Sequence, residues 1–178
     1  NTDQAQFKDN YDATNHLLST YEYDSQGNLV QIINPSAAPI LTQSINSFNY
    51  ASASGRVVKY PNNELVMYSN LSVTYNLNVQ ELSNYCIKIS TRQATSKSTP
   101  SPDYKFNFNI YVDGVLVTNV NLSATKTFTL SDFITLGNLS SGVHSLKLQW
   151  TNDKSNGTYD ANVGLQEIQL FKKGTVAT

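Results

Sequence analysis

Residues 104–122 read YKFNFNIYVDGVLVTNVNL, and apolar and polar side chains alternate on both sides of the central Asp113-Gly114 pair. A period of two residues is typical of a strand that buries one face. Asp and Gly are residues that favour the tight turns between neighbouring strands. The stretch therefore predicts two antiparallel strands, 104–112 and 115–122, joined by a hairpin turn at Asp113-Gly114.

Similar strand-like runs follow one another through the rest of the chain, with turn signals such as PNN, VDG and LSSG between them. About ten short runs at this spacing predict an all-β fold, an antiparallel two-sheet β-sandwich of the jelly-roll kind. The segment SDFITLGNL, residues 131–139, is expected to form one helical turn at most. The runs are 43–51, 55–60, 64–69, 71–79, 84–91, 104–112, 115–122, 125–133, 143–150 and 162–171.

The composition excludes several classes of function. Charged residues make up 14% of the 178 residues and the net charge is -1, so the basic field of a nucleic-acid binder is absent. No run reaches the roughly 18 apolar residues of a membrane span, and membrane insertion is not expected. The single cysteine, Cys86, excludes an internal disulfide and is expected to be a small core residue.

The first 40 residues have a pattern of their own. STYEYDSQGNLVQIIN, residues 19–34, contains two short alternating runs around Ser25-Gln26-Gly27-Asn28, which predicts a hairpin. NPSAAPIL, residues 34–41, has two prolines within five residues and is typical of an extended linker. We therefore expect an N-terminal hairpin and linker over 1–40 and the sandwich over 41–174.

Four segments together resemble one known group of proteins. ELVMYSNLSVTYNLNV (64–79) contains Tyr68 and Tyr75 ahead of an alternating strand, and FNIYVDGVLVTNVNLSATKTF (108–128) contains the hairpin. LGNLSSGVHSLKLQW (136–150) and TNDKSNGTYDANVGLQEIQL (151–170) follow. This series resembles the β-sandwich carbohydrate-binding modules of the family 6, 35, 36 and 60 type, and the last segment resembles their calcium-dependent members.

The resemblance implies a non-catalytic jelly roll that binds a polysaccharide or cell-surface glycan through loops at one end of the sandwich, or on its concave face. It implies binding roles for Tyr68, for Phe128 at a tryptophan position, and for Asn162 or Gln166 near the final strand. It also implies an extracellular or cell-surface module of a longer multidomain chain. Glutamates that hold a structural calcium in families 6 and 35 are replaced here by Asn46 and Phe48.

The polar run between the last two strands has three interpretations. Calcium takes oxygens from carboxylates, amides and backbone carbonyls, and Asp153, Asn156 and Asp160 can supply three of them. The same residue types also form turns that satisfy their own backbone. Direct sugar contact is the third possibility, since an aromatic such as Tyr159 within a polar loop is often used for binding.

Other residues are assigned by context. Trp150 shares a strand face with Leu146 and Leu148, so we expect it in the core. Glu64, like the other carboxylates outside the loop, belongs to no catalytic motif, so the protein is not expected to be an enzyme. The alternative function is an adhesin, a phage-tail receptor-binding tip or a structural sandwich. Tyr11-Asp12 and Tyr23-Asp24 resemble the YD repeats of Rhs-type surface proteins, which implies a stalk or connector.

Overall fold

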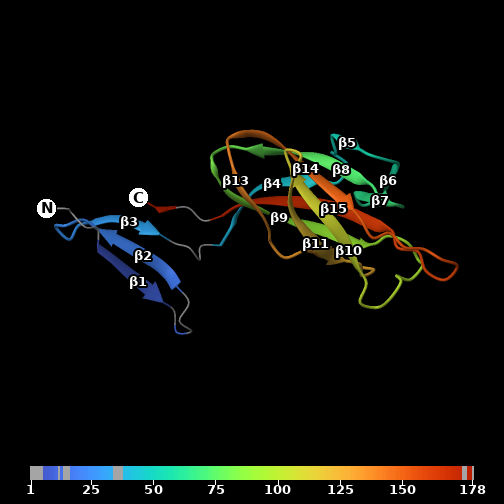
Figure 1. Cartoon of the computed structure of the whole chain (residues 1–178), viewed down its shortest axis with the longest axis horizontal. Helices are drawn as coiled ribbons and strands as arrows, with labels where there is room; N and C mark the ends of the chain where they lie inside the picture. Colours follow the sequence, from blue (N-terminus) through green and yellow to red (C-terminus); the bar gives the residue numbers. More distant parts are fainter. Residues whose placement is uncertain (1–5, 12, 14–16, 34–37, 174–175, 178) are drawn as a thin grey trace. The chain divides into compact units, whose positions relative to one another are not determined.

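The computed structural model describes residues 6–11, 13, 17–33, 38–173 and 176–177, and every regular element within them is a β-strand (Figure 1). The predicted all-β class is therefore confirmed. None of these residues forms a helix long and apolar enough to span a membrane. The chain divides into two compact units, Asn1–Ile40 with Lys172–Thr178, and Leu41–Phe171. Residues 34–37 of the expected linker, and Asp12 of the first Tyr-Asp pair, lie outside the described residues.

The first unit is an antiparallel sheet with strand order β1-β2-β3-β16. The predicted hairpin is confirmed: the Asp24 carboxylate accepts the backbone N–H groups of Gln26 and Asn28, both at 2.9 Å, and Gly27 has a φ of 82°. Because β16 follows the sandwich in the chain and pairs with β3, the sandwich is inserted between two neighbouring strands of this sheet. The strands are β1 (Gln6–Tyr11), β2 (Leu17–Tyr23), β3 (Leu29–Ile33) and β16 (Val176–Ala177).

The second unit is a sandwich of two sheets. One sheet has the order β11-β10-β14-β8-β5; its strands are β5 (Ser52–Ala53), β8 (Ser72–Val79), β10 (Lys105–Val112), β11 (Val115–Ser123) and β14 (Gly142–Trp150). The other has the order β12-β9-β15-β7-β6, with β13 beside β9 and β4 beside β15. Its strands are β4 (Ile40–Asn46), β6 (Val57–Tyr60), β7 (Glu64–Met67), β9 (Ser83–Gln93), β12 (Thr129–Leu130), β13 (Ile134–Leu139) and β15 (Val163–Lys172). The predicted two-sheet sandwich is confirmed.

One strand lies in a segment for which the sequence predicted no strand. The segment 131–139 forms no helical turn, because Ile134–Leu139 is strand β13 and pairs antiparallel with β9. Ile134, Leu136 and Leu139 are buried in this pairing. Gly137 has a φ of 92° where the register shifts, and this break disguises the alternation in the sequence.

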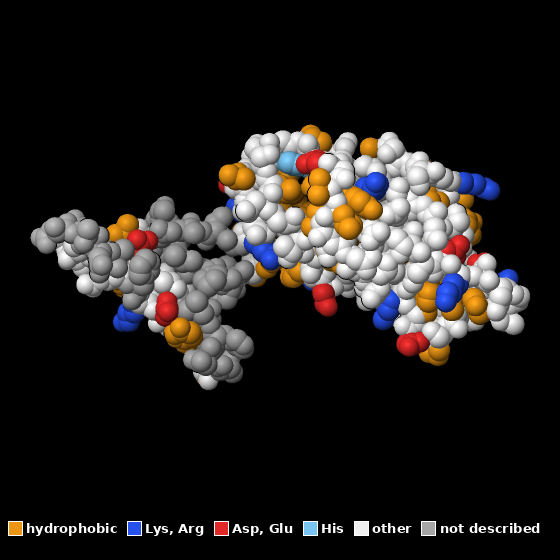
Figure 2. Space-filling model, viewed as in Figure 1, with side chains coloured by type: hydrophobic (Ala, Val, Ile, Leu, Met, Phe, Trp, Pro, Cys, Tyr) orange, Lys and Arg blue, Asp and Glu red, His pale blue; other side chains and the backbone are white. Residues whose placement is uncertain are grey.

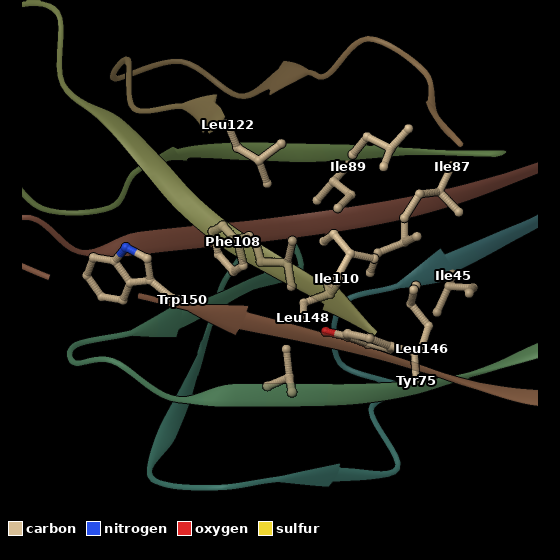
Figure 3. Close-up of a cluster of buried hydrophobic side chains, with 14 of the residues drawn as sticks. Ile45, Tyr75, Ile87, Ile89, Phe108, Ile110, Leu122, Leu146, Leu148 and Trp150 are labelled. Carbon is tan, nitrogen blue, oxygen red and sulfur yellow. The ribbon is translucent and has the colours of Figure 1, made fainter. Parts of the chain in front are cut away.

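Apolar side chains from both sheets interlock in the core (Figure 3). Tyr75, Phe108 and Trp150 come from one sheet, and Ile87 and Ile89 come from the other. Trp150 is 1% exposed, which confirms its predicted core position. Cys86 is also fully buried, as predicted. On the face drawn in Figure 2, uncharged polar groups dominate and charged side chains are scattered, as the low charge of the sequence suggests.

Candidate functional site

A surface pocket of about 520 Å³ lies where the β6–β7 turn meets the end of β9. We call it the Tyr68 pocket. Tyr68 directly follows the last residue of β7, and the residue is 41% exposed. The pocket is lined by Tyr60, Pro61, Asn62, Glu64, Tyr68, Arg92, Ala94, Thr95 and Ser96.

The turn between β6 and β7 forms one wall of the pocket. Asn62 and Asn63 both have left-handed backbone angles, with φ of 66° and 59°, a conformation that Asn tolerates better than most residues. Two side chains that do not line the pocket donate hydrogen bonds to the backbone of this turn. The Ser47 hydroxyl donates to the carbonyl of Asn63 at 2.6 Å, and the Gln166 amide donates to the carbonyl of Asn62 at 3.2 Å. Gln166 therefore braces the wall and does not line the pocket.

Two exposed tyrosines stand side by side at the pocket. The hydroxyl groups of Tyr60 and Tyr68 share a hydrogen bond. This bond and partial burial raise the pKa of the Tyr68 hydroxyl above its ordinary value. Both residues are more than two-fifths exposed, so their aromatic side chains are available to a ligand.

An ion pair forms the floor. Glu64 is 5% exposed, and its carboxylate accepts hydrogen bonds from Nε and Nη2 of Arg92, the second at 2.7 Å. Arg92 Nη1 also donates to the Lys126 carbonyl at 3.3 Å, and the guanidinium carbon lies 5.0 Å from the centre of the Phe128 ring. Phe128 thus contacts the pocket through Arg92 and is not among its lining residues. The Glu64 contact raises the pKa of Arg92.

The polar loop 151–162 lies at the same end of the sandwich as the segment that follows β9 (Figure 1). The backbone N–H of Asp160 donates to the carbonyl of Ser98 at 3.1 Å, and Tyr159 pairs with Ser98 in a parallel bridge. Tyr159 is half-buried. The Gln93 amide donates to the carbonyl of Asp160 at 2.6 Å. These contacts tie the loop to the strand that carries Arg92.

The three predicted metal ligands differ in their surroundings. Asn156 Oδ1 already accepts three bonds, from the N–H and hydroxyl of Thr158 and the N–H of Tyr159, at 2.7–2.9 Å. Asp153 Oδ1 is buried and has no hydrogen-bond partner among the described residues. Burial and the nearby charge of Asp160 raise the pKa of the Asp153 carboxyl.

Asn162 is 1% exposed, and its Oδ1 also lacks a hydrogen-bond partner among the described residues. Its amide nitrogen makes only long contacts, 3.4 Å to the Asp160 carbonyl and 3.5 Å to the Thr95 hydroxyl. Thr95 lines the Tyr68 pocket, so Asn162 supports the pocket from within the fold.

The oxygen-bearing side chains of the polar loop 151–162 meet only some of the requirements of a calcium site. Within the described ranges, no group of three His, Cys, Asp or Glu residues is placed to hold a metal. Calcium also accepts amide and carbonyl oxygens, and two buried oxygens here have no donor. Ser155 pairs with Asp160 and Ala161 donates to the Lys154 carbonyl, so Asp153 and Asn162 each lie one residue beyond this short antiparallel contact. Asp153, Asp160 and Asn162 therefore fit a cation better than Asn156 does.

The outer face of the β11-to-β5 sheet has a different character. Asn107, Asn109 and Asn119 bond to one another through their amides at 2.7–2.8 Å. Asn109 and Tyr111 also donate to Gln149, at 3.3 and 3.1 Å. Much of the hydrogen-bonding capacity of this face is therefore used within it.

Several residues to which the sequence points lie at or next to this pocket. Tyr68, Phe128 and Asn162 gather around the Tyr68 pocket, directly or through one neighbour, whereas Gln166 lies behind its wall. The Glu64–Arg92 pair was missed, because its partners are far apart in sequence. One signal was present: Glu64 heads the apolar run ELVM, and a carboxylate buried in such a strand needs a cationic partner.

The fold is shared with carbohydrate-binding modules. A family 36 module in complex with calcium and xylotriose is 20% identical, with a TM-score of 0.53, and the match covers 72% of this chain and 99% of the module. The C-terminal family 6 module of a marine laminarinase from Zobellia galactanivorans is 14% identical, with a TM-score of 0.52 and coverage of 73% and 98%.

A family 6 module from Clostridium cellulolyticum in complex with xylose is 16% identical, with a TM-score of 0.52, and the match covers 73% of this chain and 96% of that module. No protein-family model and no curated protein sequence matches the chain. At these identities the likeness establishes the fold, which agrees with the resemblance noted in the sequence.

Proposed function

We propose that the sandwich is a non-catalytic module that binds a carbohydrate in the Tyr68 pocket. One observation carries the proposal: two exposed tyrosines stand beside fixed polar groups in an open pocket. Sugars present flat C–H faces and rings of hydroxyls, which aromatic faces and neighbouring polar groups recognise together. Solved modules with this fold are complexed with xylotriose and xylose, which supports the assignment of ligand class.

Each predicted residue has a proposed role. Tyr68 stacks against the sugar, and Phe128 holds Arg92 in place from behind. Asn162 supports Thr95 in the pocket wall. Gln166 fixes the β6–β7 turn. Tyr159, on the adjoining loop, contacts a glycan long enough to extend beyond the pocket.

The Tyr68 pocket is a better candidate than the face of the sheet. The amides of the sheet face are engaged with one another, and a ligand would have to replace those bonds. The pocket instead combines exposed rings with donors held in place by a buried carboxylate. Preorganised donors of this kind cost less free energy to use in binding.

We further propose that calcium assists the module, held by Asp153, Asp160 and the amide oxygen of Asn162. A bound cation would supply partners for two buried oxygens and offset the burial and the repulsion from Asp160 that raise the pKa of the Asp153 carboxyl. Asn156 would have to exchange its present hydrogen bonds to join this set.

Thermal unfolding with and without calcium tests the ion. In the absence of a cation, the raised pKa of Asp153 means that stability falls as pH rises through that pKa. Calcium should therefore raise Tm at pH 7 and raise it less at pH 4. Asp153→Asn should abolish the calcium effect, while Asp132→Asn, outside the loop, should retain it. An equal Tm with calcium and with EDTA at pH 7 would rule the ion out.

A glycan array, read with and without calcium, tests the function itself. We expect binding to at least one polysaccharide or cell-surface glycan. Single modules bind weakly, so the protein should be presented in several copies on a bead or tetramer to gain avidity. If no glycan is retained under either condition, the carbohydrate-binding proposal fails.

The wider setting is also a proposal. We infer an extracellular or cell-surface location in a longer multidomain chain, since modules with the same fold come from a laminarinase and from a multidomain xylanase. A second candidate function, attachment within an assembly, is favoured by exposed apolar residues in the first unit, Tyr11, Leu29 and Val30. Analytical ultracentrifugation distinguishes them: concentration-dependent self-association supports assembly, and a monomer at all concentrations opposes it.

A further inference from the structure

Glu64, Phe128 and the carbonyl of Lys126 contact the guanidinium of Arg92. The buried carboxylate of Glu64 accepts from Nε and Nη2, the guanidinium carbon lies over the Phe128 ring, and Nη1 donates to Lys126. Gly164 makes room for the pair, because a Cβ there would collide with the Glu64 carboxylate and lie 3.2 Å from Arg92 Cγ. Burying a charged group costs free energy unless a well-placed partner bonds to it. Two hydrogen bonds from Arg92 supply that partner for the Glu64 carboxylate.

The orientation leaves part of the guanidinium available to a ligand. A guanidinium has five N–H donors. Two of them are used by Glu64 and one by the Lys126 carbonyl, so two remain without a partner among the described residues. The Arg92 side chain is 33% exposed, and Arg92 lines the Tyr68 pocket. The open donors are therefore at the place where the proposed sugar binds.

Further positive charge lies around the same pocket. Lys126 is next to Arg92 in space, and its amine donates to the carbonyls of Thr95 and Lys97, close to the pocket wall. Burial and the charge of Arg92 lower the pKa of the Lys126 amine. The hydrogen bond to Tyr60 raises the pKa of the Tyr68 hydroxyl, and the positive charge of Arg56 partly opposes that rise. Among the described residues, Glu64 is the only carboxylate that lines the pocket, and Arg92 neutralises it.

Resting on the proposed function, we propose that the preferred ligand is an acidic glycan, whose uronic-acid carboxylate is bound by Arg92 while its ring lies on Tyr68. A planar guanidinium fork matches a planar carboxylate and binds it with two parallel hydrogen bonds. Lys126 contributes an attractive charge at the rim. Glu64 offsets the charge of Arg92, so the additional positive charge near the pocket comes from Lys126 and Arg56.

Paired polymers test the ligand class. Polygalacturonate, alginate, glucuronoxylan and hyaluronan are each titrated calorimetrically against the carboxyl-reduced form of the same polymer, in EDTA and in calcium. At least one acidic polymer should bind about tenfold more tightly than its reduced partner, because a charge-assisted pair is worth that much. The preference should weaken between about 20 and 300 mM salt, since salt screens partly exposed charges.

Variants test whether Arg92 causes the preference for the acidic polymer. Replacing Arg92 alone would leave Glu64 buried without a partner, so the pair is changed together, as Glu64→Gln with Arg92→Gln. This variant should lose the preference for the acidic polymer, and Lys126→Gln, which leaves the pair intact, should reduce it several-fold. Lys88→Gln on the same strand is the matched control, because Lys88 lies over Phe133, which does not line the pocket. Thermal unfolding of each variant confirms that it is folded.

The outcomes separate this inference from the proposed function. Equal or tighter binding of the reduced polymer in every pair overturns the acidic-glycan assignment and leaves carbohydrate binding in place. A stronger preference for a sulfated polymer, such as chondroitin sulfate, over every uronic acid also overturns the carboxylate assignment. If neither acidic nor neutral polymers bind, it is the proposed function that fails.

Discussion

A single asparagine connects the core to the polar loop. Asn152 Oδ1 accepts from Trp150 Nε1 and from the backbone N–H of Asn107, both at 2.9 Å. Its amide nitrogen donates to the carbonyl of Lys105 at 2.8 Å. One side chain therefore satisfies the polar atom of the buried tryptophan and aligns the end of β14 with the start of β10.

Asn152→Ala should lower the free energy of unfolding by about 2–3 kcal/mol, because Trp150 Nε1 and the Asn107 N–H both lose their acceptor. Asn156→Ala, a change of the same type in the exposed part of the loop, should cost less than about 1 kcal/mol. Urea denaturation of both variants measures the difference. Equal costs would show that Asn152 does not anchor the loop.

The two asparagines also show where prediction from sequence stops. Both lie in one polar run, and nothing local distinguishes them. Asn156 bonds to its own loop, which the pattern of a turn already favours. Asn152 reaches residues 104, 105 and 107, which are distant in sequence, so its role depends on the tertiary fold.

The turn between β10 and β11 is fastened to β14. Asp113 and Gly114 have φ of 50° and 80°, as a tight hairpin requires. The Asp113 carboxylate lies 2.6 Å from His144 Nδ1 and accepts the N–H of Ser145 at 2.9 Å. His144 Nε2 lies 2.7 Å from the carbonyl of Ser140. With acceptors at both ring nitrogens, the charged imidazolium is the favoured form.

This contact should make stability depend on pH. Hydrogen bonding to Asp113 raises the pKa of His144 above 6.5, so its stabilisation is full below that value and is lost as pH rises through the raised pKa. His144 lowers the pKa of Asp113 below 3.8, so that contribution is lost as pH falls through the lowered pKa. The contact should be strongest between about pH 4 and 6.5.

His144→Gln should therefore lower Tm most near pH 5 and least near pH 9. The difference in stability should stay below about 1 kcal/mol, because the Asp113 side chain is 52% exposed and water screens the pair. Calorimetric unfolding across this range is the measurement. A difference that grows toward pH 9 would contradict the charged imidazolium.

Alternation predicted most strands, and its failures have physical causes. β10 buries every second residue, and β14 does so from Leu146 onward, so their period is visible in the sequence. β7 is buried at all four positions and shows no period, although its apolar run still marked it as a strand. β13 was missed because Gly137 shifts its register against β9. Long-range pairing, rather than local propensity, defines that strand.

The chain as a whole carries the sandwich as an insertion between β3 and β16. A core of its own, closed by two sheets, is what an independently folding domain needs. We therefore expect a fragment of residues 38–173 to keep the Tm and glycan binding of the full chain. Circular dichroism and calorimetry measure both. A fragment that unfolds at a much lower temperature would show that the small sheet supports the sandwich.

The sequence pointed to the region of the candidate site, but not to the charged residues that line it. The resemblance in the sequence pointed to Tyr68, and the structure places this residue in an open pocket. The position of Arg92 at the floor of the pocket could not be predicted from the sequence. Arg92 and Glu64 meet only because β9 and β7 lie on either side of β15. The tie between the polar loop and Ser98 depends on the same assembly.

Calorimetric titration of Tyr68→Ala and Tyr111→Ala, with the glycan that the unmodified protein binds best, tests the central claim most directly. Tyr68 stands in the pocket and Tyr111 on the face of the other sheet, so the two variants separate the two candidate surfaces. Tyr68→Ala should weaken binding about tenfold or more, and Tyr111→Ala should change it by less than about twofold. Unchanged binding by Tyr68→Ala, with loss in Tyr111→Ala, would contradict the account and move the site to the sheet.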